Sequence, residues 1–61
     1  MYRYRLVDEQ GVERGAFLSP RLAFQIGEEL ARSPGERYRI LRVVEAEPHE
    51  NLRAYLIVEA H

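Results

Sequence analysis

The chain has 61 residues, with nine arginines, no lysine and ten acidic residues, so its net charge at neutral pH is −1. This length predicts a single domain over residues 1–61 with a small core, and the balanced charge argues against a strong attraction to nucleic acid or membranes. Because the chain has no cysteine, disulfides and cysteine-based zinc sites are excluded, and we expect no metal or other cofactor.

The composition and the first residues indicate where the protein works. The chain is rich in arginine, glutamate, alanine, leucine and valine and lacks lysine and threonine. This bias is typical of GC-rich bacterial genomes and also suits a thermophile. The opening MYRYRLVDEQ contains neither an apolar run nor a small-residue cleavage site, which predicts a cytoplasmic protein without signal peptide or membrane span.

Two strands are predicted at the start of the chain. Residues 2–8 have the period-two alternation of a strand, with Tyr2, Tyr4 and Leu6 on one face and Arg3, Arg5 and Val7 on the other. The turn DEQG leads to a second strand over residues 12–18, in which Gly15 predicts a bulge or bend. The two strands are expected to form a hairpin.

The stretch SPRLAFQIGEELAR, residues 19–32, predicts an amphipathic helix over residues 20–32. Ser19 is a favourable N-cap and Pro20 a favourable first helical residue. On a helical wheel the polar side chains separate completely from the apolar ones. The polar side carries Arg21, Gln25, Glu28, Glu29 and Arg32, and the apolar side carries Leu22, Ala23, Phe24, Ile26, Gly27, Leu30 and Ala31.

Gly27 leaves an alternative open, because glycine in a helix interior costs about 1 kcal/mol. In the alternative, Gly27 is the glycine of a turn in a small barrel. Ser33–Glu36 would then be a type II turn between two strands, with Pro34 and Gly35 at its centre.

Two further strands are predicted over residues 36–47 and 52–60, joined by the polar loop EPHEN. Both carry apolar residues at successive positions, a pattern typical of strands covered on both faces. One helix covers only one face of a four-stranded sheet, so we expect the other face to be buried against a second copy. The candidate residues of this homodimer interface are Leu41, Val43, Leu56 and Val58.

No catalytic site is predicted. Ser19 and Ser33 are the only serines and are explained as a cap and a turn residue, and the chain has no nucleophile elbow, P-loop or dinucleotide-binding glycine motif. The acidic stretch 45–51 fits no metal-ligand spacing and is interpreted as a solvated loop. We therefore expect a protein that is not an enzyme, and keep catalysis as a second alternative.

Arginine and tyrosine alternate on the predicted strands, which suits a face for single-stranded nucleic acid. Strand arginines bind phosphates, and exposed aromatic rings stack on bases. The candidate residues are Arg3, Arg5, Arg37, Tyr38 and Arg39. Cross-strand pairing with glutamates explains the same arginines without a ligand, so nucleic acid is the alternative partner and not the first.

The stretch RYRILRVVEAEPHENLRAYLIVEA, together with FQIGEEL, resembles small uncharacterised proteins of GC-rich bacteria. The resemblance covers the C-terminal two-thirds of the chain and rests on generic motifs. It implies no activity, cofactor or site residue. It favours the barrel alternative, because a G-E-x-L … G-x-x-Y-x-I run also fits strands.

The predicted fold class is α+β: one small domain in the order β-β-α-β-β, with an antiparallel sheet and one helix at residues 20–32. The alternative is a small five-stranded SH3-like β-barrel. The predicted function is a small self-associating interaction or regulatory module that acts through a protein partner. A single-stranded nucleic-acid-binding module is the alternative function.

Overall fold

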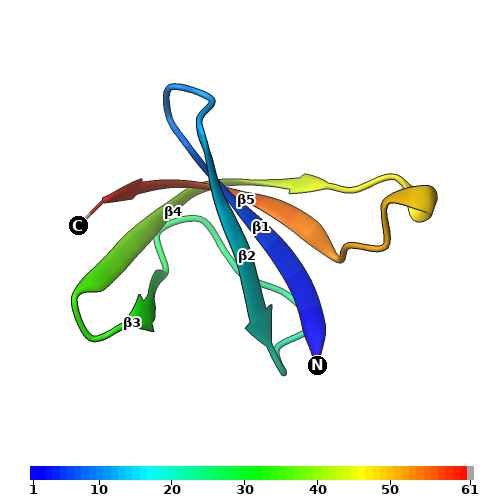
Figure 1. Cartoon of the computed structure of the whole chain (residues 1–61), viewed down its shortest axis with the longest axis horizontal. Coiled ribbons are helices and arrows are strands. Elements are labelled where there is room, and N and C mark those ends of the chain that lie inside the picture. Colours follow the sequence, from blue (N-terminus) through cyan, green and yellow to red (C-terminus); the bar gives the residue numbers. More distant parts are fainter. Residues whose placement is uncertain (61) are drawn as a thin grey trace.

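A computed structural model describes residues 1–60 of the chain. It contains β1 (Tyr2–Asp8), β2 (Glu13–Ser19), β3 (Glu29–Ser33), β4 (Glu36–Glu45), the short 3₁₀ turn η1 (Pro48–Glu50) and β5 (Ala54–Ala60). The strands form one sheet in the order β2-β1-β5-β4-β3, which curls into a half-barrel (Figure 1). Neighbouring strands are antiparallel except β1 and β5, which are parallel.

The predicted α+β fold is wrong, because no helix forms over residues 20–32. Residues 20–28 are an irregular connection, and β3 follows it. A tight turn in this connection is closed by the Glu28 N–H, which donates to the Gln25 carbonyl at 3.2 Å. Gly27 lies in this turn at a φ of +93°, an angle typical of the third residue of a type II turn and foreign to a right-handed helix.

Pairing with β4 explains why the helix does not form. The Gly27 N–H donates to the Ile40 carbonyl and the Ile40 N–H to the Glu28 carbonyl, both at 2.8 Å. Strand β3 then continues this ladder along β4. A short helix is marginally stable by itself, whereas the ladder satisfies backbone groups of both segments and covers the edge of β4.

The small five-stranded barrel held as the alternative fits the strand number and the curl of this sheet. The edge strands β2 and β3 are bridged by a side chain: Arg32 Nη1 donates to the Arg14 carbonyl at 2.5 Å and to the Ala16 carbonyl at 3.3 Å. Gly15 lies between these carbonyls at a φ of +96°, and a Cβ there would be 3.1 Å from Arg32 Nη1. The predicted bend at Gly15 is therefore part of a bulge against β1 that makes room for the bridge.

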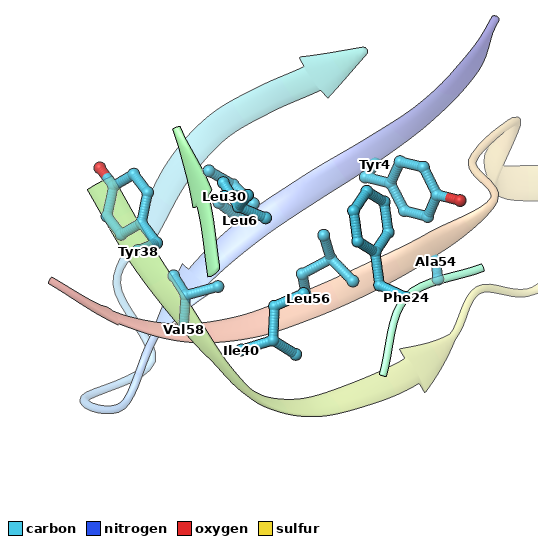
Figure 2. Packing of buried hydrophobic residues seen from close by; sticks show 9 residues of the cluster. All are labelled: Tyr4, Leu6, Phe24, Leu30, Tyr38, Ile40, Ala54, Leu56 and Val58. Atoms are coloured by element: carbon cyan, nitrogen blue, oxygen red, sulfur yellow. The ribbon is translucent and has the colours of Figure 1, made fainter. Parts of the chain in front are cut away.

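The hydrophobic core lies inside the curl of the sheet, where the nine side chains in Figure 2 converge. One of them, Phe24, comes from the irregular connection, and its ring meets Tyr4 edge-on with centroids 5.0 Å apart. Burying a large apolar side chain contributes roughly 1.5–3 kcal/mol, so these contacts hold the connection against the sheet. The core residues are Tyr4, Leu6, Phe24, Leu30, Tyr38, Ile40, Ala54, Leu56 and Val58.

A β-bulge in β4 decides which of its apolar residues face the core. The register with β5 shifts just after Ile40, so that Ile40 lies opposite Val58 and Val43 opposite Leu56. Because Leu56 and Val58 are fully buried, Ile40 and Val43 both lie on the concave side, and Leu41 is the extra residue of the bulge. The apolar run of β4 thus reflects a change of alternation within the strand.

Candidate functional site

The convex side of the sheet carries an apolar patch with no second layer of secondary structure over it among residues 1–60. Val7 pairs with Ile57 across β1 and β5, and Val44 pairs with Tyr55 across β4 and β5. Since their neighbours in the strands face the core, these four side chains share the convex side. We call Val7, Val44, Tyr55 and Ile57 the outer patch.

The outer patch lies on β1, β5 and β4, the three central strands of the sheet. Val44 is 38% exposed, and the other three residues are half-buried. A single-layer antiparallel sheet can leave one face in water, but contiguous large apolar side chains on a small monomer usually mark an interface. The outer patch is therefore the candidate interaction surface.

Charged side chains border the outer patch, and several of them are paired. Arg5 forms an ion pair with Glu13, and the Tyr55 hydroxyl donates to the Glu50 carboxylate. The bond from Tyr55, followed by one from the Glu47 N–H, lowers the pKa of Glu50, and the same contact raises the pKa of Tyr55. Glu50 is therefore ionised at neutral pH, and its hydrogen bond to the hydroxyl fixes the position of the Tyr55 ring.

Among the charged residues of the convex side that have no partner within residues 1–60, Arg42 and Glu59 carry opposite charges. Arg42 lies opposite Ile57 and Glu59 lies opposite Arg39, and neither Arg42 nor Glu59 forms an ion pair or side-chain hydrogen bond within the described residues. Their charges are opposite, so the convex side offers a donor and an acceptor to a second, identical surface.

The predicted interface residues do not share one surface. Leu56 and Val58 are fully buried in the core of their own chain, Val43 is 38% exposed on the concave side, and Leu41 is half-buried at the bulge. Ile57, between the two buried residues of β5, is the one that faces outwards. Alternation along β5 already indicates from the sequence that Ile57 lies on the opposite face from Leu56 and Val58. It does not indicate which of the two faces is buried.

The predicted nucleic-acid residues are also distributed over different parts of the sheet. Tyr38 is 7% exposed in the core, and its hydroxyl donates to a glutamate at 2.5 Å. Arg5 and Arg39 are each paired with a glutamate. Arg3 and Arg37 lie on β1 and β4, which β5 separates. The five residues therefore form no single basic and aromatic surface.

The acidic stretch 45–51 forms the end of β4 and the turn η1. Glu47 and Glu50 cap this turn reciprocally, with the Glu47 N–H donating to the Glu50 carboxylate at 2.7 Å. Asn51 ends the turn at a φ of +58°. Within residues 1–60, no group of three or more potential ligands could hold a metal ion.

A groove of about 570 Å³ opens between the start of β1, the end of β2 and the residues that lead from η1 into β5. Its lining includes Tyr2, Arg3, Leu18, Leu52 and Arg53, and it contains no carboxylate. Arg3 was a predicted site residue, whereas Arg53 was assigned only to the predicted strand over residues 52–60. In the structure Arg53 lies just before β5. Only the pairing of β1 with β5 brings the two arginines together.

Comparison with known proteins finds no protein family, curated protein or solved structure that matches this chain. Among residues 1–60, no helix is long and apolar enough to cross a membrane.

Proposed function

We propose that this protein is a small self-associating interaction module that pairs through its outer patch and acts through a protein partner. The observation that carries the proposal is the patch itself, with four apolar or aromatic side chains on the convex side of a single-layer sheet. A standard interface takes about 800 Å² from each partner, close to a fifth of the 4265 Å² that this chain exposes. One side of the sheet is sufficient for such an interface.

The unpaired charges favour a second copy as the occupant. In a twofold dimer the same surface of both chains meets, so if one residue faces a second residue of the twin, the second residue faces the first in return. Arg42 and Glu59 of one copy can then pair with Glu59 and Arg42 of the other. Such complementarity sets the register of an interface and disfavours wrong partners.

Sedimentation equilibrium of the wild-type protein at micromolar concentration tests the proposal. We expect a species of twice the 7.2 kDa mass of one chain, with dissociation on dilution. A single 7.2 kDa species over the whole concentration range would contradict self-association.

Two adjacent substitutions in β5 separate the interface from the core. Ile57→Asp places a charge on the outer patch and should give a folded monomer. Leu56→Asp places a charge in the core, where an unpaired ion costs several kcal/mol, and should unfold the chain. Circular dichroism reports folding and sedimentation reports mass; a folded dimer of Ile57→Asp would show that the copies meet elsewhere.

Charge exchange then tests the twofold arrangement. Arg42→Glu and Glu59→Arg should each weaken the dimer, because like charges would face each other across the interface. The double variant should restore it, since opposite charges meet again. If the double variant is as weak as the two single ones together, Arg42 and Glu59 are not partners.

A further inference from the structure

We infer that the groove at the start of β1 binds a phosphate ester carried on an aromatic body, in the manner of a mononucleotide. Its volume of about 570 Å³ lies within the roughly 300–1,000 Å³ of small-ligand sites. The residues that line it include two arginines, a tyrosine and several apolar residues, and none of them carries a carboxylate. This combination is independent of the outer patch.

Both arginines of the groove have free donors. Arg3 forms no side-chain hydrogen bond or ion pair within residues 1–60. Arg53 donates from Nε to the Leu22 carbonyl at 2.8 Å, which holds the side chain. Its two terminal nitrogens have no partner among the described residues. Five of the nine arginines are in ion pairs, so two free guanidiniums lining one groove form a distinct feature of this surface.

The backbone holds these two arginines at the same end of the sheet. The Arg53 N–H donates to the Arg3 carbonyl at 2.7 Å, and the parallel pairing of β1 with β5 continues from there, with Tyr4 opposite Ala54. Each of these two residues brings a positive charge to this end of the sheet, and a bound anion is attracted to both. Guanidinium groups bind phosphate through pairs of hydrogen bonds.

Tyr2 and Leu18 offer a surface for the remainder of the ligand. Tyr2 is 40% exposed and Leu18, which lies opposite Arg3, is 55% exposed, and both line the groove. An exposed tyrosine ring provides a stacking face for an aromatic base. A phosphate with an aromatic body therefore matches the groove better than inorganic phosphate does.

The distribution of charge favours a short ligand over a nucleic-acid strand. Arg37 and Arg42, which have no carboxylate partner within residues 1–60, lie on β4 and are separated from β1 by β5. Binding along a strand requires a continuous track of positive charge, whereas the whole chain carries −1. Two guanidiniums in one groove suit a single phosphate group.

Titration of the full chain with adenosine monophosphate, followed by amide chemical shifts, tests this inference. We expect saturable shifts at residues of the groove, and at least tenfold weaker binding of adenosine and of inorganic phosphate, since about a tenfold change corresponds to one good polar contact. Arg3→Gln should weaken the binding of adenosine monophosphate at least about tenfold. Arg37→Gln is the matched control, with the same loss of charge on β4, and should bind like the wild type.

Other outcomes would overturn the inference. If millimolar adenosine monophosphate caused no chemical-shift changes, or if Arg37→Gln weakened binding as much as Arg3→Gln, the groove would not be a binding site for this ligand. If succinate bound as tightly as adenosine monophosphate, the ligand would not be specifically a phosphate ester. If a thymidine dodecamer bound much more tightly than adenosine monophosphate, the ligand would be a nucleic-acid strand and not a mononucleotide. The Ile57→Asp variant should bind adenosine monophosphate like the wild type, so failure of the dimer and failure of the groove are distinguishable.

Discussion

Gly27 is the third residue of the turn that carries the chain into β3, and its φ is +93°. Nothing lies within 4 Å of the position that its Cβ would take, so a side chain is opposed only by the backbone conformation. An L-residue with such a φ costs about 1–2 kcal/mol. We expect Gly27→Ala to lower the free energy of unfolding by about that amount, which a thermal melt shows as a loss of several degrees.

Gly35→Ala is the matched control at the residue scale. Gly35 also has open space around it, but its φ is not positive. Alanine there should leave the melting temperature unchanged or raise it slightly, because it restricts the unfolded chain. In a helix Gly27→Ala would be neutral or stabilising, so a melting temperature at or above that of the wild type would contradict the turn.

At the scale of the elements, Arg32 takes the place of a backbone ladder between β2 and β3. Its guanidinium donates to the carbonyls of Arg14 and Ala16 on β2 and forms an ion pair with Glu36 on β4. Arg32→Met keeps the apolar stem and removes these contacts. We expect the free energy of unfolding in urea to fall by about 1–2 kcal/mol, the range for charge-assisted hydrogen bonds partly screened by water.

Arg37→Met is the control for this prediction. Arg37 lies opposite Ala31 in the same β3–β4 hairpin. Its substitution removes the same charge and keeps the same apolar stem, and Arg37 has no ion pair to break within the described residues. It should be as stable as the wild type. Equal destabilisation of both variants would mean that the bridge between the edge strands contributes nothing specific.

At the scale of the whole molecule, we expect the stability of the half-barrel to depend on pH. The Glu36 carboxylate accepts from Arg32 and, at 2.5 Å, from the Tyr38 hydroxyl. These bonds, the one from Arg32 first, lower the pKa of Glu36, and the bond to Glu36 raises the pKa of Tyr38. The carboxylate therefore contributes stability that is complete above its ordinary pKa of 4.5 and is lost as the pH falls further.

The tyrosine acts at the other end of the pH range. Its raised pKa contributes stability that is complete below the ordinary value of 10.0 and is lost as the pH rises through the raised value. We therefore expect a plateau of stability between these limits. Urea unfolding of the wild type and Glu36→Gln checks the acid limit: the difference between them should be largest at neutral pH and shrink below pH 4.5, and a constant difference would contradict it.

The sequence by itself determined the positions of four strands and the turns between them. The predicted strands over residues 2–8, 12–18, 36–47 and 52–60 lie within two residues of β1, β2, β4 and β5 at each end. These segments are predictable because alternating or successive apolar side chains and the residues DEQG and EPHEN are local properties of the chain. The bulge at Gly15 is local for the same reason.

Only the tertiary structure decided the path of residues 20–32, the buried face of the sheet and the residues that meet at its surfaces. The backbone of Ile40 forms hydrogen bonds with Gly27 and Glu28. A helical wheel of residues 20–32 cannot predict this contact, because Ile40 lies outside the segment. The bulge at Leu41 turns Val43 towards the core, and the pairing of β1 with β5 places Arg53 beside Arg3. Each of these depends on hydrogen bonds and burial between segments far apart in the chain, and such contacts override local preference because they satisfy more backbone groups and bury more apolar surface.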